Sequence, residues 1–381
     1  MKTPLRTFLL CCLGLCSPPL WAQELSGYVG TMPSFTVQQP GGHVWGQALV
    51  HNRLNFGWQM AETLRADVGM RNRFLTGSEA LLDPQGMRND FGWVRLSWNW
   101  AQDKRAVGNT TFDRLSMTFE KNAWKLQAGR QRINWGHTFA WNPNNIFNTH
   151  AFFDFDYPER PGADALRATY FHDETSASEL AASVGHDNKV TAAFLHRWNW
   201  EKMDFQLLAG TLAQSDVVFG GAWTSDFHGF NFRSEFSYFH PLSNTGKARD
   251  VVALSFGADY MLPHSLMLQA EVLWNNASMQ DVGKAGPMGL YSAPLSAKVL
   301  SFSRWNFFAQ AVLPLTPRLE ASWSAMYFVD IQAWYTGLLL EHSVVDNVEF
   351  SFCMQFFSVA SKVKLANMQA LLGFARLKYI F

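Results

Sequence analysis

The residues best suited to bind a solute lie in one central stretch of the sequence, residues 129–162. It reads GRQRINWG at 129–136, WNPNNIFN at 141–148 and FDFDYPERPG at 153–162. Guanidinium groups bind carboxylates and phosphates through paired hydrogen bonds, and aromatic and amide side chains add flat surfaces and polar contacts. The candidates for solute contact are Arg130, Arg132, Trp135, His137, Trp141, Asn142, Asn144, Asn145, Asp154, Asp156 and Arg160.

Each group of residues in this stretch also has a purely structural interpretation. Buried aromatic side chains commonly anchor a loop to the surface beneath it. Asparagines are frequent in turns because their side chains hydrogen-bond to the nearby backbone. The sequence therefore leaves two interpretations open, a solute platform or a loop that is fixed in place.

Four more arginines, Arg65, Arg71, Arg73 and Arg95, occur where polar and apolar residues alternate. A local excess of arginine near 65–73 and 130–132 favours an anionic group on the solute. Acidic residues occupy equivalent positions on other segments, so the charges could instead pair across neighbouring strands and keep a wall polar and rigid. Both hypotheses predict that these side chains point to the same, water-filled side.

Metal and hydrolase chemistry are poorly supported. His137 and His150 lack a third ligand at a fixed spacing, so we predict no metal site and no cofactor. Asp154 and Asp156 lack the glycine and the distal glutamate of a calcium loop. The sequence has no Gly-x-Ser-x-Gly elbow, and an enzyme would need a base beside a nucleophile. An outer-membrane hydrolase remains a minor alternative.

The segments that carry these residues alternate with a period of two. In 230–238 the aromatic residues fall on one face and Asn231, Arg233 and Glu235 fall on the other; 348–356 shows the same pattern. Alternation of this kind indicates strands with one apolar and one polar face. The runs are about 10 to 13 residues long, longer than the average globular strand, and aromatic residues gather at their ends, as in the girdles of membrane barrels. We predict an all-β fold, a transmembrane antiparallel β-barrel.

The composition supports this fold class. Aromatic residues make up 15% and charged residues only 16% of the 381 residues, which suits an outer surface that meets something other than water. Lys+Arg and Asp+Glu are equal at 31 each, so there is no basic excess for a nucleic-acid partner.

Counting the alternating runs gives about 18 strands, with 16 as the rival count. The predicted strands are 44–59, 62–76, 91–101, 110–121, 124–133, 164–173, 177–185, 189–199, 203–212, 216–225, 230–240, 251–262, 265–275, 299–313, 317–328, 331–341, 347–357 and 369–381. The run 25–35 is left over, as an extra strand or an N-terminal lead. The long connection 77–90 falls among the short turns in this register, which conflicts with the short periplasmic turns of such barrels.

The two ends of the sequence predict its destination. Residues 1–22 combine a basic start, an apolar core and a small residue for cleavage, which is typical of a secretory signal. Residues 23–381 would then form the barrel. The last run ends on Phe381, which resembles the C-terminal signature that the barrel-assembly machinery reads in Gram-negative outer-membrane proteins. We therefore expect the cell outer membrane, with its lipid and lipopolysaccharide, as the environment.

The three central motifs also carry a family resemblance. GRQRINWG, WNPNNIFN and FDFDYPERPG resemble an uncharacterised family of Gram-negative outer-membrane barrel proteins, described as porin-like, and the likeness covers most of residues 23–381. The resemblance implies the barrel fold and the outer membrane but no established substrate. Loosely similar families are thought to work beside inner-membrane exporters of the RND type and periplasmic lipid carriers.

From these patterns we predict a porin-like channel for a small polar or amphipathic solute. Arg130 and Arg132 fall on the apolar parity of their strand, so we expect a bulge near Gly129 that turns them inward, or a strand end above the membrane. The aromatic connection 134–163 is expected to fold into the lumen and narrow it. The alternatives are an outer-membrane component of a lipid or hydrophobic-compound export system, and a passive barrel with a plugged lumen. Whether the protein is a monomer or a trimer is left open.

Overall fold

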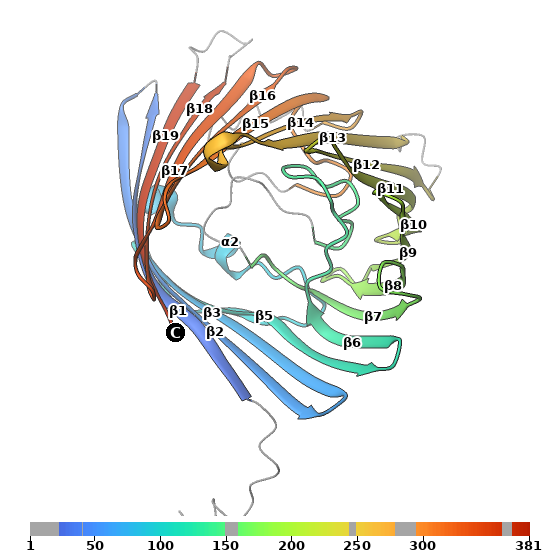
Figure 1. Ribbon diagram of the computed structural model, residues 1–381. Coiled ribbons are helices and arrows are strands. Elements are labelled where there is room, and N and C mark those ends of the chain that lie inside the picture. The colour runs from blue at the N-terminus through green and yellow to red at the C-terminus, as the bar shows by residue number, and fades with distance from the viewer. Residues whose placement is uncertain (1–22, 40, 149–158, 244–248, 279–294, 360–367) are drawn as a thin grey trace, which may run out of the picture.

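The computed structural model describes residues 23–39, 41–148, 159–243, 249–278, 295–359 and 368–381, which form one antiparallel sheet. The sheet closes on itself because β1 pairs with both β2 and β19, as the ring in Figure 1 shows. Its strands are β1 (Gln23–Gln39), β2 (His43–Ala61), β3 (Leu64–Gly77), β4 (Ser97–Asp103), β5 (Ala106–Lys121), β6 (Trp124–Gln131), β7 (Ala163–Phe171), β8 (Ala177–Val184), β9 (Val190–Trp200), β10 (Met203–Leu212), β11 (Asp216–Phe227), β12 (Phe230–Pro241), β13 (Val251–Met261), β14 (Met267–Asn275), β15 (Trp305–Thr316), β16 (Leu319–Phe328), β17 (Ala333–Val345), β18 (Val348–Val359) and β19 (Met368–Ile380).

Three short helices accompany the strands: the 3₁₀ helices η1 (Glu79–Leu81) and η2 (Pro263–Ser265), and the helix α2 (Pro84–Arg88). None of the helices in the described residues is long and apolar enough to cross a membrane.

Eighteen of the nineteen described strands form the closed ring. β3 pairs with β5 along residues 106–119 and so occupies one edge of β5. The other edge is shared, because β4 pairs with residues 106–111 and β6 with residues 115–121. β4 therefore continues the wall beyond the end of β6 and is not a separate strand of the ring. Nineteen strands less β4 give a ring of eighteen.

The predicted number of strands is confirmed, but one of the eighteen predicted members was wrong and the run left over takes its place. The leftover run 25–35 belongs to β1, which closes the ring against β19. The predicted strand 91–101 is not a stave, because only its second half is extended, as β4. With β1 counted as a barrel strand and 91–101 left out, the connection 77–90 no longer falls among the short turns. The long connection between β3 and β5 lies at the same end of the barrel as the other long connections. The short turns lie at the opposite end, which by the usual rule is periplasmic.

The alternating residues form these strands because each stave has lipid on one side and the lumen on the other. In β12, Phe236 is 43% exposed on the outside, while its neighbour Glu235 is 2% exposed on the inside. A closed ring also leaves no strand edge with unpaired backbone groups, which a bilayer core would penalise by several kcal/mol for each group. The fold is thus a transmembrane β-barrel.

The interior of the barrel differs from the wet lumen expected from sequence. Two clusters of buried apolar side chains lie within the ring, one around Trp141, Phe302 and Tyr335 and one around Trp135 and Phe239. They form where the connections after β6 and after β14 pack against inward-facing residues of β8–β19. One side of the barrel is therefore filled.

Candidate pore and its internal loop

The connection after β6 turns into the ring, where Figure 1 shows it beside the strands β8–β14. Glu235 of β12 holds its first bend. The carboxylate accepts hydrogen bonds from the backbone N–H groups of His137 and Thr138, the latter at 2.7 Å, and from Asn144 N–H at 3.1 Å. Backbone donors that converge on one buried carboxylate compensate for its removal from water.

Glu271 of β14 holds the next bend in the same way. Its carboxylate accepts the N–H groups of Phe139, Ala140 and Trp141 at 2.7, 2.9 and 3.0 Å, and the Ser255 hydroxyl at 2.8 Å. The side chain of Glu271 is 4% exposed. The carboxylates of Glu235 and Glu271 together thus bind six backbone N–H groups of the loop.

Side chains fix the rest of the loop. Trp135 donates its indole N–H to Glu179 of β8 at 2.6 Å and packs edge-on against Phe147, with ring centroids 4.9 Å apart. Asn145 accepts the N–H groups of Trp135 and Gly136 at 2.8 and 3.0 Å, and Asn144 donates to the Gly221 carbonyl at 2.9 Å. In the described residues, Trp135, Asn144 and Asn145 serve to anchor the loop.

His137 and Trp141 have similar roles. The His137 ring lies 3.0 Å from Gln206 Oε1 on β10. Trp141 is 4% exposed and packs edge-on against Phe308, with ring centroids 6.4 Å apart. Asn142 accepts the N–H of Asn145 through its backbone carbonyl at 3.1 Å, as in a turn.

On the other side of the barrel, along β1–β6, the described residues leave a hollow. This hollow of about 530 Å³ lies against the inner face of these strands. Its charged lining consists of four arginines and three carboxylates, an excess of one positive charge: Arg53, Arg65, Arg114, Arg132, Glu24, Asp67 and Glu159.

The arginines of this hollow differ in how they are held. Arg53 forms a buried pair with Asp113, with one bond of 2.8 Å. Arg65 contacts Asp67 at 2.8 Å and Glu24 at 3.1 Å. Arg114 donates to the Glu159 carbonyl at 2.5 Å. These charge pairs do not join neighbouring strands as the sequence interpretation expected: Arg53 reaches Asp113 across β3, and Arg65 reaches Glu24 across β2.

Arg132 lies just after the end of β6 and lines the same hollow. It has no hydrogen bond or ion pair with the residues that the structure describes, although the loop residues 149–158 lie outside them. Asp154 and Asp156, two of the predicted site residues, fall in that range. Arg160 lies at φ +57° and its carbonyl accepts a hydrogen bond from Arg114 at 3.0 Å.

Arg71 and Arg73 lie further along β3, toward the end that leads into the long connection to β5. Arg71 is 2% exposed. Arg73 donates to Asn109 at 2.8 Å and to the Met87 carbonyl at 3.0 Å, so it holds α2 inside the ring. Arg95 is exposed and lies in the segment before β4, not in the expected inward strand.

Arg130 overturns a local expectation. It pairs with Leu115 in unbroken register, and Leu115 is exposed on the outside, so no bulge turns Arg130 to the lumen. The residue is nevertheless 3% exposed, because residues 90–96 cover it. It donates to Asp164 at 2.7 and 2.9 Å, to Asp90 at 2.7 Å and to the Val94 carbonyl at 2.6 Å. A charge on the lipid side is thus neutralised within the wall.

Sequence reasoning missed the residues that hold the loop, Glu179, Glu235 and Glu271. The alternation identifies Glu235 and Glu271 as inward-facing, but only the fold shows that loop backbone groups reach them. An acidic residue in mid-strand opposite a long aromatic connection is the one signal that could have suggested the contact.

Comparisons with known proteins agree with this architecture. No protein-family model and no curated protein matches the chain. Among solved structures, OccAB4 of Acinetobacter baumannii has a TM-score of 0.60 at 8% identity, over 96% of this chain and 100% of that one. OpdQ of Pseudomonas aeruginosa has a TM-score of 0.57 at 8% identity, over 94% and 98%. OpdK of the same organism, solved with vanillate, has a TM-score of 0.57 at 7% identity, over 94% and 99%.

These likenesses agree in fold alone, over nearly the whole length of each chain, with the closed β-barrel described above. At identities of 7 to 9% they say nothing of the solute. The expected fold and the membrane-spanning character of the chain are confirmed.

Proposed function

We propose that this protein is a porin-like channel of the cell outer membrane, with its conducting path along β1–β6 and the loop after β6 as its constriction. The observation that carries the proposal is the division of the lumen. The loop is fixed to the wall of β8–β14 through Glu235 and Glu271, and the hollow of about 530 Å³ remains on the opposite side. A loop held by buried carboxylates is a rigid constriction.

The solute that suits this path is a small anion with an apolar part. The hollow has four arginines against three carboxylates, and Arg132 has no partner among the described residues. Guanidinium groups bind carboxylate and phosphate oxygens in pairs. Phe139, Ile331 and Leu372 are partly buried at the edge of the apolar cluster inside the ring. We infer that an amphipathic anion contacts the arginines with its charge and this apolar edge with its apolar part.

The outer surface supports the proposed location. Aromatic and aliphatic side chains such as Trp200, Phe219 and Trp334 are exposed on the outside. In a bilayer they would contact lipid and, at the outer end, lipopolysaccharide. At the other end Phe381 exchanges backbone hydrogen bonds of 2.9 and 3.0 Å with Gly27, so the C-terminal residue completes the seam of the barrel. We infer that the barrel-assembly machinery recognises this strand.

Planar-bilayer recording tests the proposal. The purified protein should open steady channels, and in a gradient of KCl its reversal potential should have the sign of anion preference. A small aromatic carboxylate added to one side should reduce the chloride current by occupying the path. Cation preference would refute the assignment of an anionic solute, and absence of conductance would refute a channel.

A further inference from the structure

A serine and two histidines converge on the outer side of the barrel wall, away from the lumen. Ser178 of β8 shares its outward face with Leu180, which is 58% exposed, while Glu179 between them points inward. Ser178 Oγ lies 2.8 Å from Nε2 of His172 and 3.0 Å from Nδ1 of His196. A hydroxyl within hydrogen-bond distance of an imidazole is the pairing that activates a serine nucleophile.

This cluster lies at the short-turn end of the barrel, beside aromatic side chains. His172 belongs to the short turn between β7 and β8, and His196 is the cross-strand partner of Ser178 in β9. Aromatic side chains surround it: His196 stacks on Trp198 at 5.5 Å and His172 meets Tyr170 at 4.9 Å. Aromatic girdles mark the depth where lipid head groups and ester bonds meet the acyl chains.

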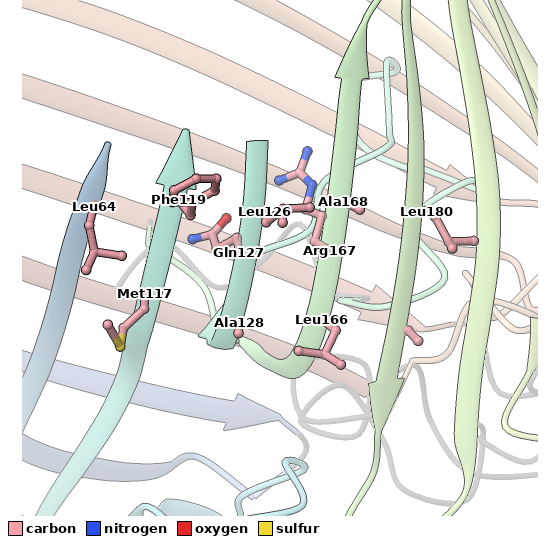
Figure 2. A pocket seen from close by; sticks show the side chains of 11 residues that line it. Leu64, Met117, Phe119, Leu126, Gln127, Ala128, Leu166, Arg167, Ala168 and Leu180 are labelled. Atoms are coloured by element: carbon pink, nitrogen blue, oxygen red, sulfur yellow. The ribbon is translucent and has the colours of Figure 1, made fainter. Parts of the chain in front are cut away.

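An apolar hollow of about 510 Å³ adjoins the cluster on the same outer face. Figure 2 shows side chains from β3, β5, β6, β7 and β8 around it. Its apolar lining is Leu64, Met117, Phe119, Leu126, Ala128, Leu166, Ala168, Leu180 and Ala182. The strand register places the cluster nearer the turn between β7 and β8 and the hollow further from it. Ser178 pairs with Tyr170, and the next outward pair, Leu180 with Ala168, already lines the hollow further from the turn.

We propose that Ser178, His172 and His196 form a hydrolytic site for the ester bond of a membrane lipid, whose acyl chain occupies this hollow. A lipid of the periplasmic leaflet would place its ester at the girdle and extend its chain toward the middle of the bilayer. The cluster and the hollow are arranged in that order. The site is separate from the conducting path, because its side chains are on the other face of the wall.

The reaction follows the acyl-enzyme course. The Ser178 hydroxyl attacks the ester carbonyl carbon while its proton passes to Nε2 of His172. The bond between the carbonyl carbon and the lipid alkoxy oxygen breaks, and the departing oxygen takes that proton. Water then attacks the acyl-serine, gives its proton to His172 and releases the fatty acid, after which the proton returns to Ser178 Oγ. His196, on the other side of Oγ, donates its Nδ1–H to Oγ, which leaves the hydroxyl hydrogen pointing at His172.

Asp173 supports the positive charge that His172 acquires. Hydrogen bonds from the backbone and hydroxyl of Thr175 hold the pKa of the Asp173 carboxyl below its ordinary value, and attraction to His172 contributes in the same direction. Asp173 therefore stays ionised beside the imidazole. The other titratable side chains in ring contact with His172 are His196 and Tyr170.

Hydrolysis of a fluorogenic phospholipid in vesicles tests the proposal. The full-length protein should come from a host that lacks its own outer-membrane phospholipase. We expect Ser178→Ala and His172→Ala to lower the rate by about 100-fold or more, the contribution of an activated nucleophile and its base. A fluorophosphonate probe should label Ser178, as mass spectrometry of its peptide would show.

The matched control is His240→Ala, an exposed histidine at the opposite rim that contacts Asp250 at 2.9 Å. It should keep full activity, and every variant should keep the conductance and the heat-dependent gel mobility of a folded barrel. Absence of both lipid hydrolysis and Ser178 labelling in the unaltered protein would overturn the proposal. Full activity in Ser178→Ala would do the same, and neither result would affect the channel.

Discussion

Arg130 of β6 and Asp164 of β7 face each other across neighbouring strands on the lipid side of the wall, joined by parallel hydrogen bonds of 2.7 and 2.9 Å. The same guanidinium reaches Asp90 and the carbonyl of Val94, while Asp164 accepts the Val94 N–H at 2.8 Å. The segment that contains Asp90 and Val94 therefore completes the wall above two short staves, β6 and β7. The same segment extends this part of the wall further, because Gly92 forms an isolated antiparallel β-bridge with Gly185, just after β8.

Replacing Arg130 should destabilise the barrel strongly. Arg130→Gln leaves the carboxylates of Asp90 and Asp164 buried without their cation, which costs about 3–5 kcal/mol for a buried pair. We expect a fall of that size in the free energy of unfolding, measured by urea titration in lipid vesicles with the gel shift of the folded form. The control Arg318→Gln removes an arginine whose side chain is 60% exposed, and it should cost less than about 1 kcal/mol. Equal effects of the two changes would contradict this account of the wall.

Neutralising the carboxylates that hold the loop should widen the pore. In Glu235→Gln and Glu271→Gln the side-chain shape stays, but the charge that binds the backbone N–H groups of 137–144 is lost. Hydrogen bonds to a charged acceptor contribute about 1.5–3 kcal/mol, so the loop should detach part of the time. Single-channel recording should show a larger and noisier conductance.

The matched control for the loop is Glu320→Gln, an exposed residue of β16 that is far from the loop and lies beside the short turns. It should leave the conductance of each channel unchanged. An unchanged current in both Glu235→Gln and Glu271→Gln would show that the loop does not limit conduction.

The barrel could be predicted from sequence because the choice between an apolar and a polar residue at each position depends only on which side of its own strand that position faces. Each residue of β12 or β18 faces either lipid or lumen, and a period of two records that choice. The errors arose where another segment replaces lipid or water. Arg130 has lipid-facing parity, yet residues 90–96 cover it, and no periodicity near Arg130 reports a segment 40 residues away.

The candidate site was predictable only in part for the same reason. The composition of 134–163 predicted a loop that folds into the lumen and narrows it, and the described residues 134–148 pack against the inner wall. Its partners Glu235 and Glu271 lie 91 to 132 residues further along the chain, so nothing local identifies them. Ser178 and His196 are likewise paired only by the register of β8 and β9.

Gly129 should resist substitution because of its backbone and its surroundings. Its φ is +109°, a conformation that residues with a side chain rarely adopt, and an added Cβ would lie 2.2 Å from the Leu115 carbonyl oxygen. Strain of this kind costs of order 1–3 kcal/mol, so Gly129→Ala should lower the free energy of unfolding by at least that much. The control Gly46→Ala meets no atom within 4 Å of the new Cβ and should be nearly neutral. Urea titration of both variants measures the difference.

The charge of Arg132 should set the ion preference of the pore. Arg132 lines the hollow beside Arg65 and Arg114, where the lining has an excess of one positive charge. Arg132→Gln removes that excess and should bring the reversal potential in a KCl gradient close to zero. Arg132→Glu makes the lining net negative and should reverse its sign. Charges in a narrow passage act at short range and are little screened, so one residue can have this effect.

The matched control is Arg95→Gln, which removes the same charge from an exposed position in the segment before β4, away from the hollow. It should leave the reversal potential where the unaltered protein has it. If Arg95→Gln and Arg132→Gln shifted the potential equally, ion preference would follow the net charge of the whole protein and not this lining. A difference confined to Arg132 would instead locate the selective part of the path beside β6, at the point where the internal loop begins.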